Sequence, residues 1–308
     1  MIDRHFSADI FHVKYLPTWL GVSFWWLVVQ LLPYKVLMAL GWVVGKLMRR
    51  FAHRRVQIAE QNLAACFPEK TAQERAALLG EIMDSLGKAV FECGMAWFWP
   101  AWRLRRVITL KGMEHIQASV DKGQGVLLLG LHFTTLEMSV KAISMTGALD
   151  GVYQKHKNIA FEYVQNRGRE HLACGGVVIN KRDVRGMVKR LRNLRAVLYV
   201  PDQDYGRDKS VFAPLFNISA ATVTAPSKLI RLGKAAAIPY IVHRHSKGYT
   251  VEVLPPLKGL GEGDEVDDAR IINTFVEQEI RRCPGQYLWV HRRFKTRPEG
   301  EPDFYKLS

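Results

Sequence analysis

Short apolar runs that recur between helix-length stretches constrain the fold of this chain more than any other feature. Strand-sized apolar segments that alternate with helices are typical of a largely parallel sheet covered on both faces. We therefore predict an α/β fold with a mostly parallel sheet flanked by helices. The runs are VLLLGL (126–131), GGVVI (175–179), AVLYV (196–200) and AAIPYIV (236–242).

Two local patterns add a hairpin and a long helix. IPYIVHRH (238–245) and YTVEVL (249–254) are separated by three residues, which predicts an antiparallel hairpin at the edge of the sheet. Residues 71–95 have a helical pattern, in which Thr71 is the expected N-cap and Glu74 completes a capping box three residues later.

The N-terminal segment LPTWLGVSFWWLVVQLL (16–32) carries no formal charge over seventeen residues. A membrane span needs roughly 17 to 25 apolar residues, so this length predicts a single transmembrane helix, with a buried core helix as the alternative. Basic residues are more numerous after the segment than before it, which predicts a cytoplasmic body. Arg4 and Lys14 precede it, and Lys35, Lys46, Arg49, Arg50, Arg54 and Arg55 follow it.

The next stretch, VLMALGWVVGKLMRRFAHRR (36–55), has apolar residues on much of a helix and basic residues at its end. This pattern fits a helix lying in an anionic membrane surface, and it fits an ordinary core helix with a solvated end equally well. The domain organisation predicted is a membrane anchor with an interfacial helix at 1–48 and a cytoplasmic domain at 49–308.

The overall charge requires an acidic partner. The 308 residues include 44 Lys and Arg against 29 Asp and Glu, a formal net charge of +15. Nucleic acid, anionic lipid or an acidic protein would each satisfy that charge. The four cysteines are far apart, without zinc-ligand spacing, and are interpreted as reduced structural thiols, so we propose no metal site.

The strongest candidate for chemistry is GVLLLGLHFTTLE, in which an apolar strand ends at His132 and Glu137 follows five residues later. Residues at the carboxyl end of a parallel strand point into the crevice where open α/β sheets bind ligands. With His132 on the strand-to-helix turn and Glu137 in the first turns of the helix, the carboxylate can orient the imidazole as a general base. The spacing alone also occurs by chance, in which case both residues are structural.

A second strand end carries the acidic pair Asp202 and Asp204, in YVPDQDYG. These carboxylates could cap a loop or orient an acceptor hydroxyl. Cations suited to phosphate or carboxylate groups lie in NRGREH and INKRDVRG, although a solvated basic face is the simpler interpretation of any one of them. They are Arg167, Arg169, Lys181, Arg182 and Arg185.

The C-terminal segment YLWVHRRFKTRPEG places Arg292 and Arg293 among aromatic residues. Basic residues interleaved with aromatics also occur in nucleic-acid-binding proteins. The chain has no helix-turn-helix, zinc-finger or RNP-like signature, so we expect no nucleic-acid partner.

Several motifs in order resemble the late acyltransferases of lipid A biosynthesis, of the lauroyltransferase type. They are AWFWP, GMEHI, HFTTLE, PDQDYG, SVFAPLF, AATVT and YLWVHRRFKTRPEG, which together span nearly the whole chain. The resemblance implies a glycerolipid acyltransferase-like domain at the inner membrane of a Gram-negative bacterium, in contact with its lipids. It also implies transfer of an acyl chain, lauroyl or similar, from acyl carrier protein to a hydroxyacyl chain of Kdo-lipid IV-A, without a cofactor.

By the same resemblance His132 is the general base and Glu137 its partner, and Arg169 and Asp202 fall in blocks that bind the acceptor or stabilise the intermediate. The substrate-binding residues expected are Arg167, Arg169, Asp202, Asp204, Arg292 and Arg293. One departure from close relatives is VYQKHKN, where Gln154 stands in place of an Arg and Lys155 or Lys157 could supply the charge.

Two alternatives remain at this point. The first is an acyl-CoA-dependent lysophospholipid acyltransferase, and the second is a non-catalytic basic membrane-binding protein.

Overall fold

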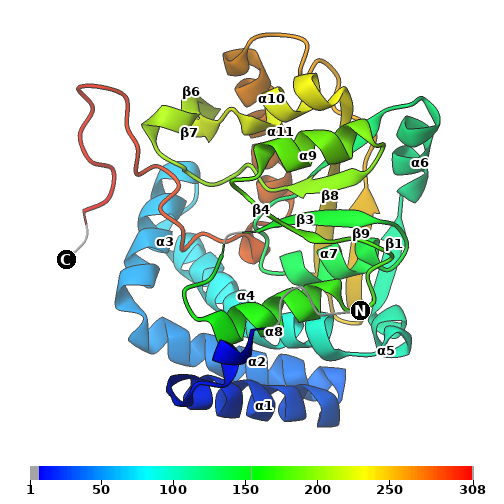
Figure 1. Cartoon of the computed structure of the whole chain (residues 1–308). Helices are drawn as coiled ribbons and strands as arrows, with labels where there is room; N and C mark the ends of the chain where they lie inside the picture. The colour runs from blue at the N-terminus through cyan, green and yellow to red at the C-terminus, as the bar shows by residue number, and fades with distance from the viewer. Residues whose placement is uncertain (1–6, 154, 307–308) are drawn as a thin grey trace.

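A seven-stranded sheet forms the centre of the molecule in the computed structural model, which describes residues 7–153 and 155–306 (Figure 1). Its strand order is β1-β9-β8-β2-β5-β3-β4, and a separate two-stranded sheet pairs β6 with β7. The strands are β1 (Ile108–Lys111), β2 (Gly125–Leu129), β3 (Leu149–Tyr153), β4 (Val178–Asn180), β5 (Ala196–Tyr199), β6 (Ser210–Leu215), β7 (Ile218–Val223), β8 (Ala235–His245) and β9 (Gly248–Val253).

Every neighbouring pair in the large sheet is parallel except β8 with β9. The mostly parallel sheet predicted from the apolar runs is therefore confirmed. The β8–β9 hairpin is also confirmed, but its predicted place at the edge is wrong, because β1 pairs with β9 on the outside and β8 lies beside β2 in the centre. The edge strand β1, with the sequence ITLK, is only four residues long. Its alternation of apolar and polar residues is too short to be recognised in the sequence.

Helices cover both faces of the sheet (Figure 1). Two of them, α9 and α10, pack on one face, while α4, α7 and α8 lie on the other. The helices are α1 (Leu16–Leu31), α2 (Tyr34–Phe51), α3 (His53–Cys66), α4 (Ala72–Phe98), α5 (Ala101–Val107), α6 (Met113–Asp121), α7 (Leu136–Ser144), α8 (Ile159–Glu170), α9 (Val184–Arg192), α10 (Ala225–Gly233) and α11 (Glu265–Arg282).

The long helix α4 begins where the sequence predicted. The Thr71 side chain accepts a hydrogen bond from the Glu74 backbone N–H, and the Glu74 carboxylate accepts one from the Thr71 N–H, so the capping box is formed. The helix continues to Phe98, slightly beyond the predicted end, because its last turns are buried against the rest of the molecule.

Helix α2 packs against α4 through glycines that leave no room for side chains. A Cβ built on Gly87 of α4 would lie 2.1 Å from the Gly41 carbonyl oxygen and 2.3 Å from the Gly45 nitrogen, both in α2. The two backbones are therefore in direct contact. The boundary predicted after residue 48 falls inside α2, which ends at Phe51.

The predicted transmembrane helix is not supported. Among residues 7–153 and 155–306, no helix combines the length and the apolar character needed to cross a bilayer. The apolar segment forms α1, whose sixteen residues extend about 24 Å at 1.5 Å per residue, and Pro33 separates it from α2. Arg4, which contributed to the predicted orientation, lies outside the described residues.

We expect Gly87→Ala to destabilise the protein by about 1–3 kcal/mol, because the added methyl group pushes α2 away from α4. The higher helix propensity of Ala, worth about 1 kcal/mol, offsets only part of this loss. Gly80→Ala in the same helix is the control, since a Cβ there meets only the end of the Arg49 side chain, at 3.2 Å. Urea unfolding of both variants checks the prediction, and equal stability of the two would contradict it.

Candidate active site

A His–Asp pair joins the ends of two neighbouring strands. His132 follows β2, and Asp202 follows β5, which runs parallel to β2 in register. The His132 Nδ1 atom lies 2.6 Å from Asp202 Oδ1, and the His132 backbone N–H donates to Asp202 Oδ2 at 2.9 Å. The carboxylate therefore holds both the ring and the backbone of His132.

The electrostatics of this pair define the tautomer of the imidazole. Burial alone raises the pKa of Asp202, but the positive charge that His132 carries when protonated and the hydrogen bonds that it donates outweigh burial, so the pKa lies below its ordinary value. An ionised carboxylate only accepts hydrogen bonds, which places the imidazole proton on Nδ1. The Nε2 atom is left as a proton acceptor, and His132 lines the cavity described below.

Glu137 has a different partner from the one predicted. Arg169 Nε donates to Glu137 Oε1 at 3.1 Å and Arg169 Nη2 donates to the same oxygen, while Trp97 Nε1 donates to Oε2 at 2.8 Å. Burial raises the pKa of Glu137, but the Arg169 charge and these hydrogen bonds lower it further than burial raises it. Of the described residues, Asp202 rather than Glu137 orients His132, because parallel register brings the two strand ends together.

The backbone that carries Arg169 is held by a buried lysine of α7. Lys141 Nζ donates to the carbonyl oxygens of Gly168, at 2.9 Å, and of Arg169 and His171. A cation is well placed there, because these carbonyls belong to the C-terminal end of α8. Desolvation lowers the pKa of Lys141 to about 8.

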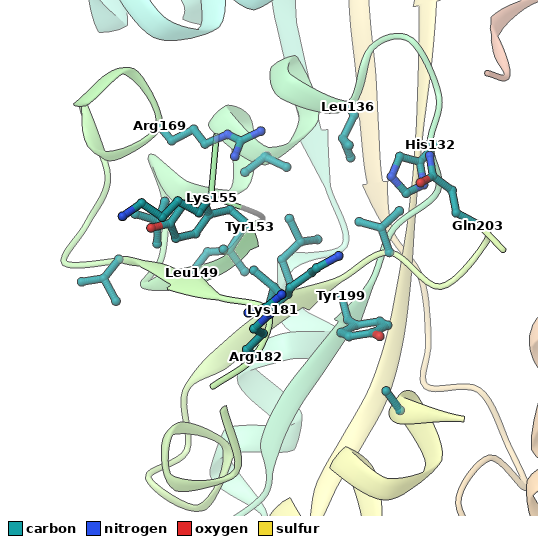
Figure 2. A pocket seen from close by; sticks show the side chains of 18 of the residues that line it. His132, Leu136, Leu149, Tyr153, Lys155, Arg169, Lys181, Arg182, Tyr199 and Gln203 are labelled. Atoms are coloured by element: carbon teal, nitrogen blue, oxygen red, sulfur yellow. The ribbon is translucent and has the colours of Figure 1, made fainter. Parts of the chain in front are cut away.

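A cavity of about 1220 Å³ opens beside His132 (Figure 2). Side chains alternate along β3, and Asp150 bonds Arg190 of α9, so Leu149, Gly151 and Tyr153 share the opposite face, toward α7 and α8. Leu136 and Val140 of α7 add apolar side chains on that side, and the Glu137–Arg169 pair lines it as well. Further cations in the described lining are Lys155, Lys157, Lys181, Arg182, Lys209 and Lys228.

Of the predicted substrate-binding residues, Arg169 lies in the described cavity lining. Asp202 is buried behind His132 instead. Asp204 accepts hydrogen bonds from the Thr296 backbone N–H and hydroxyl, both at 2.8 Å, and so ties down the C-terminal segment. These carboxylates were predictable as strand-end residues, but their partners were not.

The three other predicted cations do not belong to the described lining of the cavity. Arg293 is buried and donates to the Ala221 carbonyl oxygen at 2.7 Å, while the Arg292 guanidinium lies over the Tyr305 ring. Arg167 lies in α8, outside that lining. Arg292 and Arg293 of the C-terminal motif therefore make contacts within the protein that stabilise the fold. Gln154 lies outside the described residues, and Lys155 and Lys157 both line the cavity.

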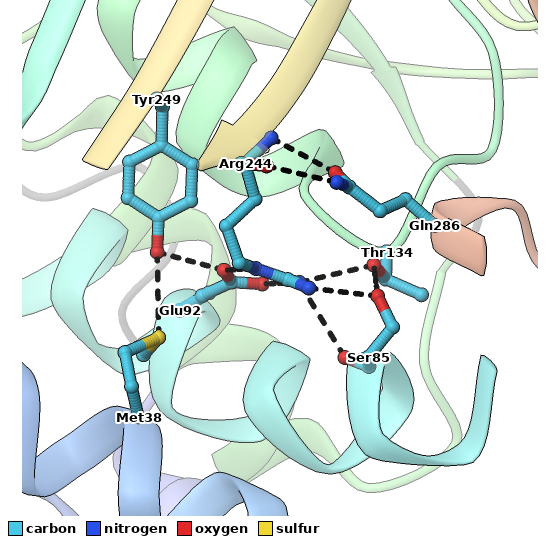
Figure 3. A network of polar contacts seen from close by, with 7 residues as sticks. All are labelled: Met38, Ser85, Glu92, Thr134, Arg244, Tyr249 and Gln286. Atoms are coloured by element: carbon cyan, nitrogen blue, oxygen red, sulfur yellow. Dashed lines mark hydrogen bonds and ion pairs between the residues drawn. The ribbon is translucent and has the colours of Figure 1, made fainter. Parts of the chain in front are cut away.

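A buried polar network holds the turn after His132 (Figure 3). Arg244 of β8 pairs with Glu92 of α4 through Nη2, at 2.7 Å, and donates to the Thr134 hydroxyl at 3.1 Å. Tyr249 also donates to Glu92, and Ser85 lies 2.7 Å from Thr134. The network connects α4, β8 and β9 to the turn that carries the catalytic candidate.

Backbone hydrogen bonds also join the turn after His132 to residues 286–288. The Thr134 N–H donates to the Gln286 carbonyl oxygen at 2.8 Å, and the Leu288 N–H donates to the His132 carbonyl oxygen at 3.0 Å. Neither these hydrogen bonds nor Trp97, Glu92 and Arg244 were identified as part of the site from the sequence. Two of the motifs noted in the sequence pointed to this region: Trp97 lies in AWFWP, and Gln286 directly precedes YLWVHRRFKTRPEG.

A candidate base at the carboxyl edge of a parallel α/β sheet, beside a cavity lined by apolar and basic side chains, suits an acyltransferase. The sequence profile described as "Bacterial lipid A biosynthesis acyltransferase" matches residues 3–296. The chain therefore belongs to the bacterial lipid A biosynthesis acyltransferase family, as the motifs indicated.

Its relatives in Escherichia coli (strain K12) agree. The chain is 42% identical to the lipid A biosynthesis lauroyltransferase and 40% identical to the palmitoleoyltransferase, each alignment covering 97% of this chain and 98% of the relative. It is 28% identical to the myristoyltransferase, over 98% of this chain and 94% of the relative.

We expect Arg244→Met to cost about 3–5 kcal/mol of stability, because it leaves the buried Glu92 carboxylate without its cation. Replacing both partners, as Arg244→Met with Glu92→Leu, should restore part of that loss. Arg270→Met is the matched control, since its ion pair with Asp267 is exposed and worth at most about 1 kcal/mol. Urea unfolding measures all three, and an Arg244→Met cost no larger than the control would show that the network does not stabilise the turn.

Proposed function

We propose that this enzyme transfers a fatty acyl chain from acyl carrier protein to a hydroxyl group on a hydroxyacyl chain of Kdo-lipid IV-A. The observation that carries the proposal is the His132–Asp202 pair at the wall of a large cavity lined by both apolar and basic side chains. A general base of this kind suits acyl transfer to an alcohol, which needs removal of the hydroxyl proton.

The proposed reaction needs no covalent acyl-enzyme. His132 Nε2 removes the proton of the acceptor hydroxyl, and the oxygen attacks the thioester carbonyl to form a tetrahedral oxyanion. Asp202 stabilises the imidazolium that results. The carbon–sulfur bond then breaks, the carrier thiolate leaves, and His132 returns the proton to it. Glu137 acts by holding Arg169 at the cavity wall rather than by contacting His132.

The cavity lining fits two amphipathic substrates. Apolar side chains on the α7 side suit acyl chains, and the cations suit the phosphate groups of the acceptor or of the carrier's prosthetic arm. The net charge of +15 suits an acidic carrier protein and an anionic lipid surface, which are the partners expected from the sequence.

We also propose that α1 and α2 lie in the surface of the inner membrane. Large apolar side chains are exposed along one stripe of α1, among them Leu20, Phe24 and Leu31, at 64%, 69% and 70%. Exposed basic residues of α2 and α3 lie beside the apolar ones, including Lys46, Arg50 and Arg54. This combination is typical of interfacial helices that bind anionic lipid.

We expect His132→Ala and Asp202→Asn each to lower kcat by about 10²–10⁴-fold, because the first removes the base and the second its tautomer and charge. The assay uses the full-length protein with acyl carrier protein thioesters and Kdo-lipid IV-A, and detects the product by mass spectrometry. Asp121→Asn, at the exposed end of α6, is the control.

Activity retained by folded His132→Ala or Asp202→Asn protein would contradict the catalytic assignment. A preference for acyl-CoA and a lysophospholipid would favour the alternative enzyme instead. Turnover with neither donor would favour a binding protein.

We expect Leu20→Glu and Phe24→Glu each to weaken binding to phosphatidylglycerol vesicles by about tenfold or more, since each removes a large side chain from the bilayer. Leu232→Glu is the matched control, because that side chain is 52% exposed on α10, away from α1. Vesicle co-sedimentation measures binding. Equal losses in all three variants would rule out this membrane surface.

A further inference from the structure

Gly151 stands at an interior position of the sheet without a structural reason for being glycine. It lies in β3, which is paired on both sides, with β5 and with β4. Glycine in a strand interior costs stability, because it adds backbone entropy in the unfolded chain and has no side chain to pack. Its φ is not in the left-handed region, so backbone conformation does not require it.

Other glycines near the sheet are explained by close packing, and Gly151 is not. A Cβ on Gly125 would lie 2.0 Å from the Leu191 carbonyl oxygen, and one on Gly176 would lie 2.1 Å from the Leu149 carbonyl oxygen. A Cβ on Gly151 meets no described atom within 4 Å. The position therefore faces open space, and that space is the cavity that Gly151 lines.

The neighbours of Gly151 make this gap part of an apolar wall. Register places Leu198 of β5 and Val178 of β4 on either side of it, and both line the cavity. Leu149 and Tyr153 share its face along β3, and Val140 of α7 also lines the cavity. Gly151 thus leaves a gap between the apolar side chains of its strand and of the two neighbouring strands.

The wall extends away from the base. His132 lies at the carboxyl edge of the sheet, whereas Leu149 begins β3 at the level of Ala196, the first residue of β5. From Tyr153 back to Leu149 the strand covers about 13 Å, at roughly 3.3 Å per residue. A linear chain whose first carbon is at His132 can follow this path toward the amino end of β3.

We propose that the acyl chain of the donor lies along β3 over Gly151, and that the absence of a side chain at this position sets the longest chain the enzyme accepts. The proposal rests on the acyl-transfer function proposed above. We favour the donor chain over an acceptor chain for this position. The acyl chains of the acceptor lipid can stay in the bilayer, whereas the carrier-bound chain is shielded from water only if the protein cavity encloses it.

The test is a graded series at Gly151. Gly151→Ala, Gly151→Val and Gly151→Phe add increasing volume to the cavity wall, and Val and Phe favour strands, so the variants should fold. Gly147→Ala is the control, because its Cβ meets only the end of Met113, at 3.7 Å, and Gly147 is not in the described lining. The kcat/KM of each full-length protein is measured with carrier thioesters from octanoyl to palmitoyl, and melting temperatures are recorded beside them.

The expected result is a shift of the preferred donor toward shorter chains that grows from Ala to Val to Phe. The value of kcat/KM should fall by about tenfold for each methylene that no longer fits. The octanoyl donor should be nearly unaffected, and the Gly147→Ala profile should match that of the unchanged protein.

Three results would overturn the proposal: an equal loss for every donor, an unchanged chain-length profile, or a shift that follows the acceptor's chains instead. In each of them the unchanged protein still transfers acyl chains, so the proposed function survives. If the unchanged protein transfers no chain from any donor, both proposals fail together.

Discussion

The parallel pairing of β2 with β5 is the constraint on which the candidate active site depends. Parallel strands end at the same edge of a sheet, so the residues after β2 and after β5 emerge side by side although they are seventy positions apart. This places the Asp202 carboxylate against both the ring and the backbone of His132. A short carboxylate buried at that point holds one tautomer and leaves the outer nitrogen free for chemistry.

A second ion pair performs a different task beside the first. Glu137 and Arg169 join α7 to α8, and Trp97 of α4 completes the contact. Lys141 then holds the end of α8 from which Arg169 projects. Arg244, which is paired with Glu92, also donates a hydrogen bond to the Thr134 hydroxyl in the turn after His132. Buried charges are costly unless paired and hydrogen-bonded, and the Glu137–Arg169 and Arg244–Glu92 pairs meet that requirement beside the turn after His132.

The same architecture separates two kinds of surface in the cavity. Leu136 and Val140 of α7 lie with Leu149 and Gly151 of β3 in an apolar part of the lining, while Arg182 and lysines line other parts of the cavity, among them Lys181 and Lys228. The proposed reaction, which joins a carrier-bound chain to a phosphorylated lipid, uses both environments near one base. The exposed apolar side chains of α1 and α2 fit the proposed position of these helices in the membrane surface.

The sequence by itself determined the fold class, the long capped helix, the hairpin, the family and the position of His132 at a strand end. These depend on local patterns: apolar runs, capping residues and ordered motifs. Tertiary structure alone decided that Asp202 orients His132, that Glu137 binds Arg169, and that Asp204 and Arg293 hold the C-terminal segment. It also showed that, among the described residues, no helix is sufficiently long and apolar to cross a membrane, and that β1 pairs with β9 at the outer side of the hairpin. The physical reason is that a side chain's partner depends on which strands are neighbours and in what register, and residues close in sequence can then point to different partners.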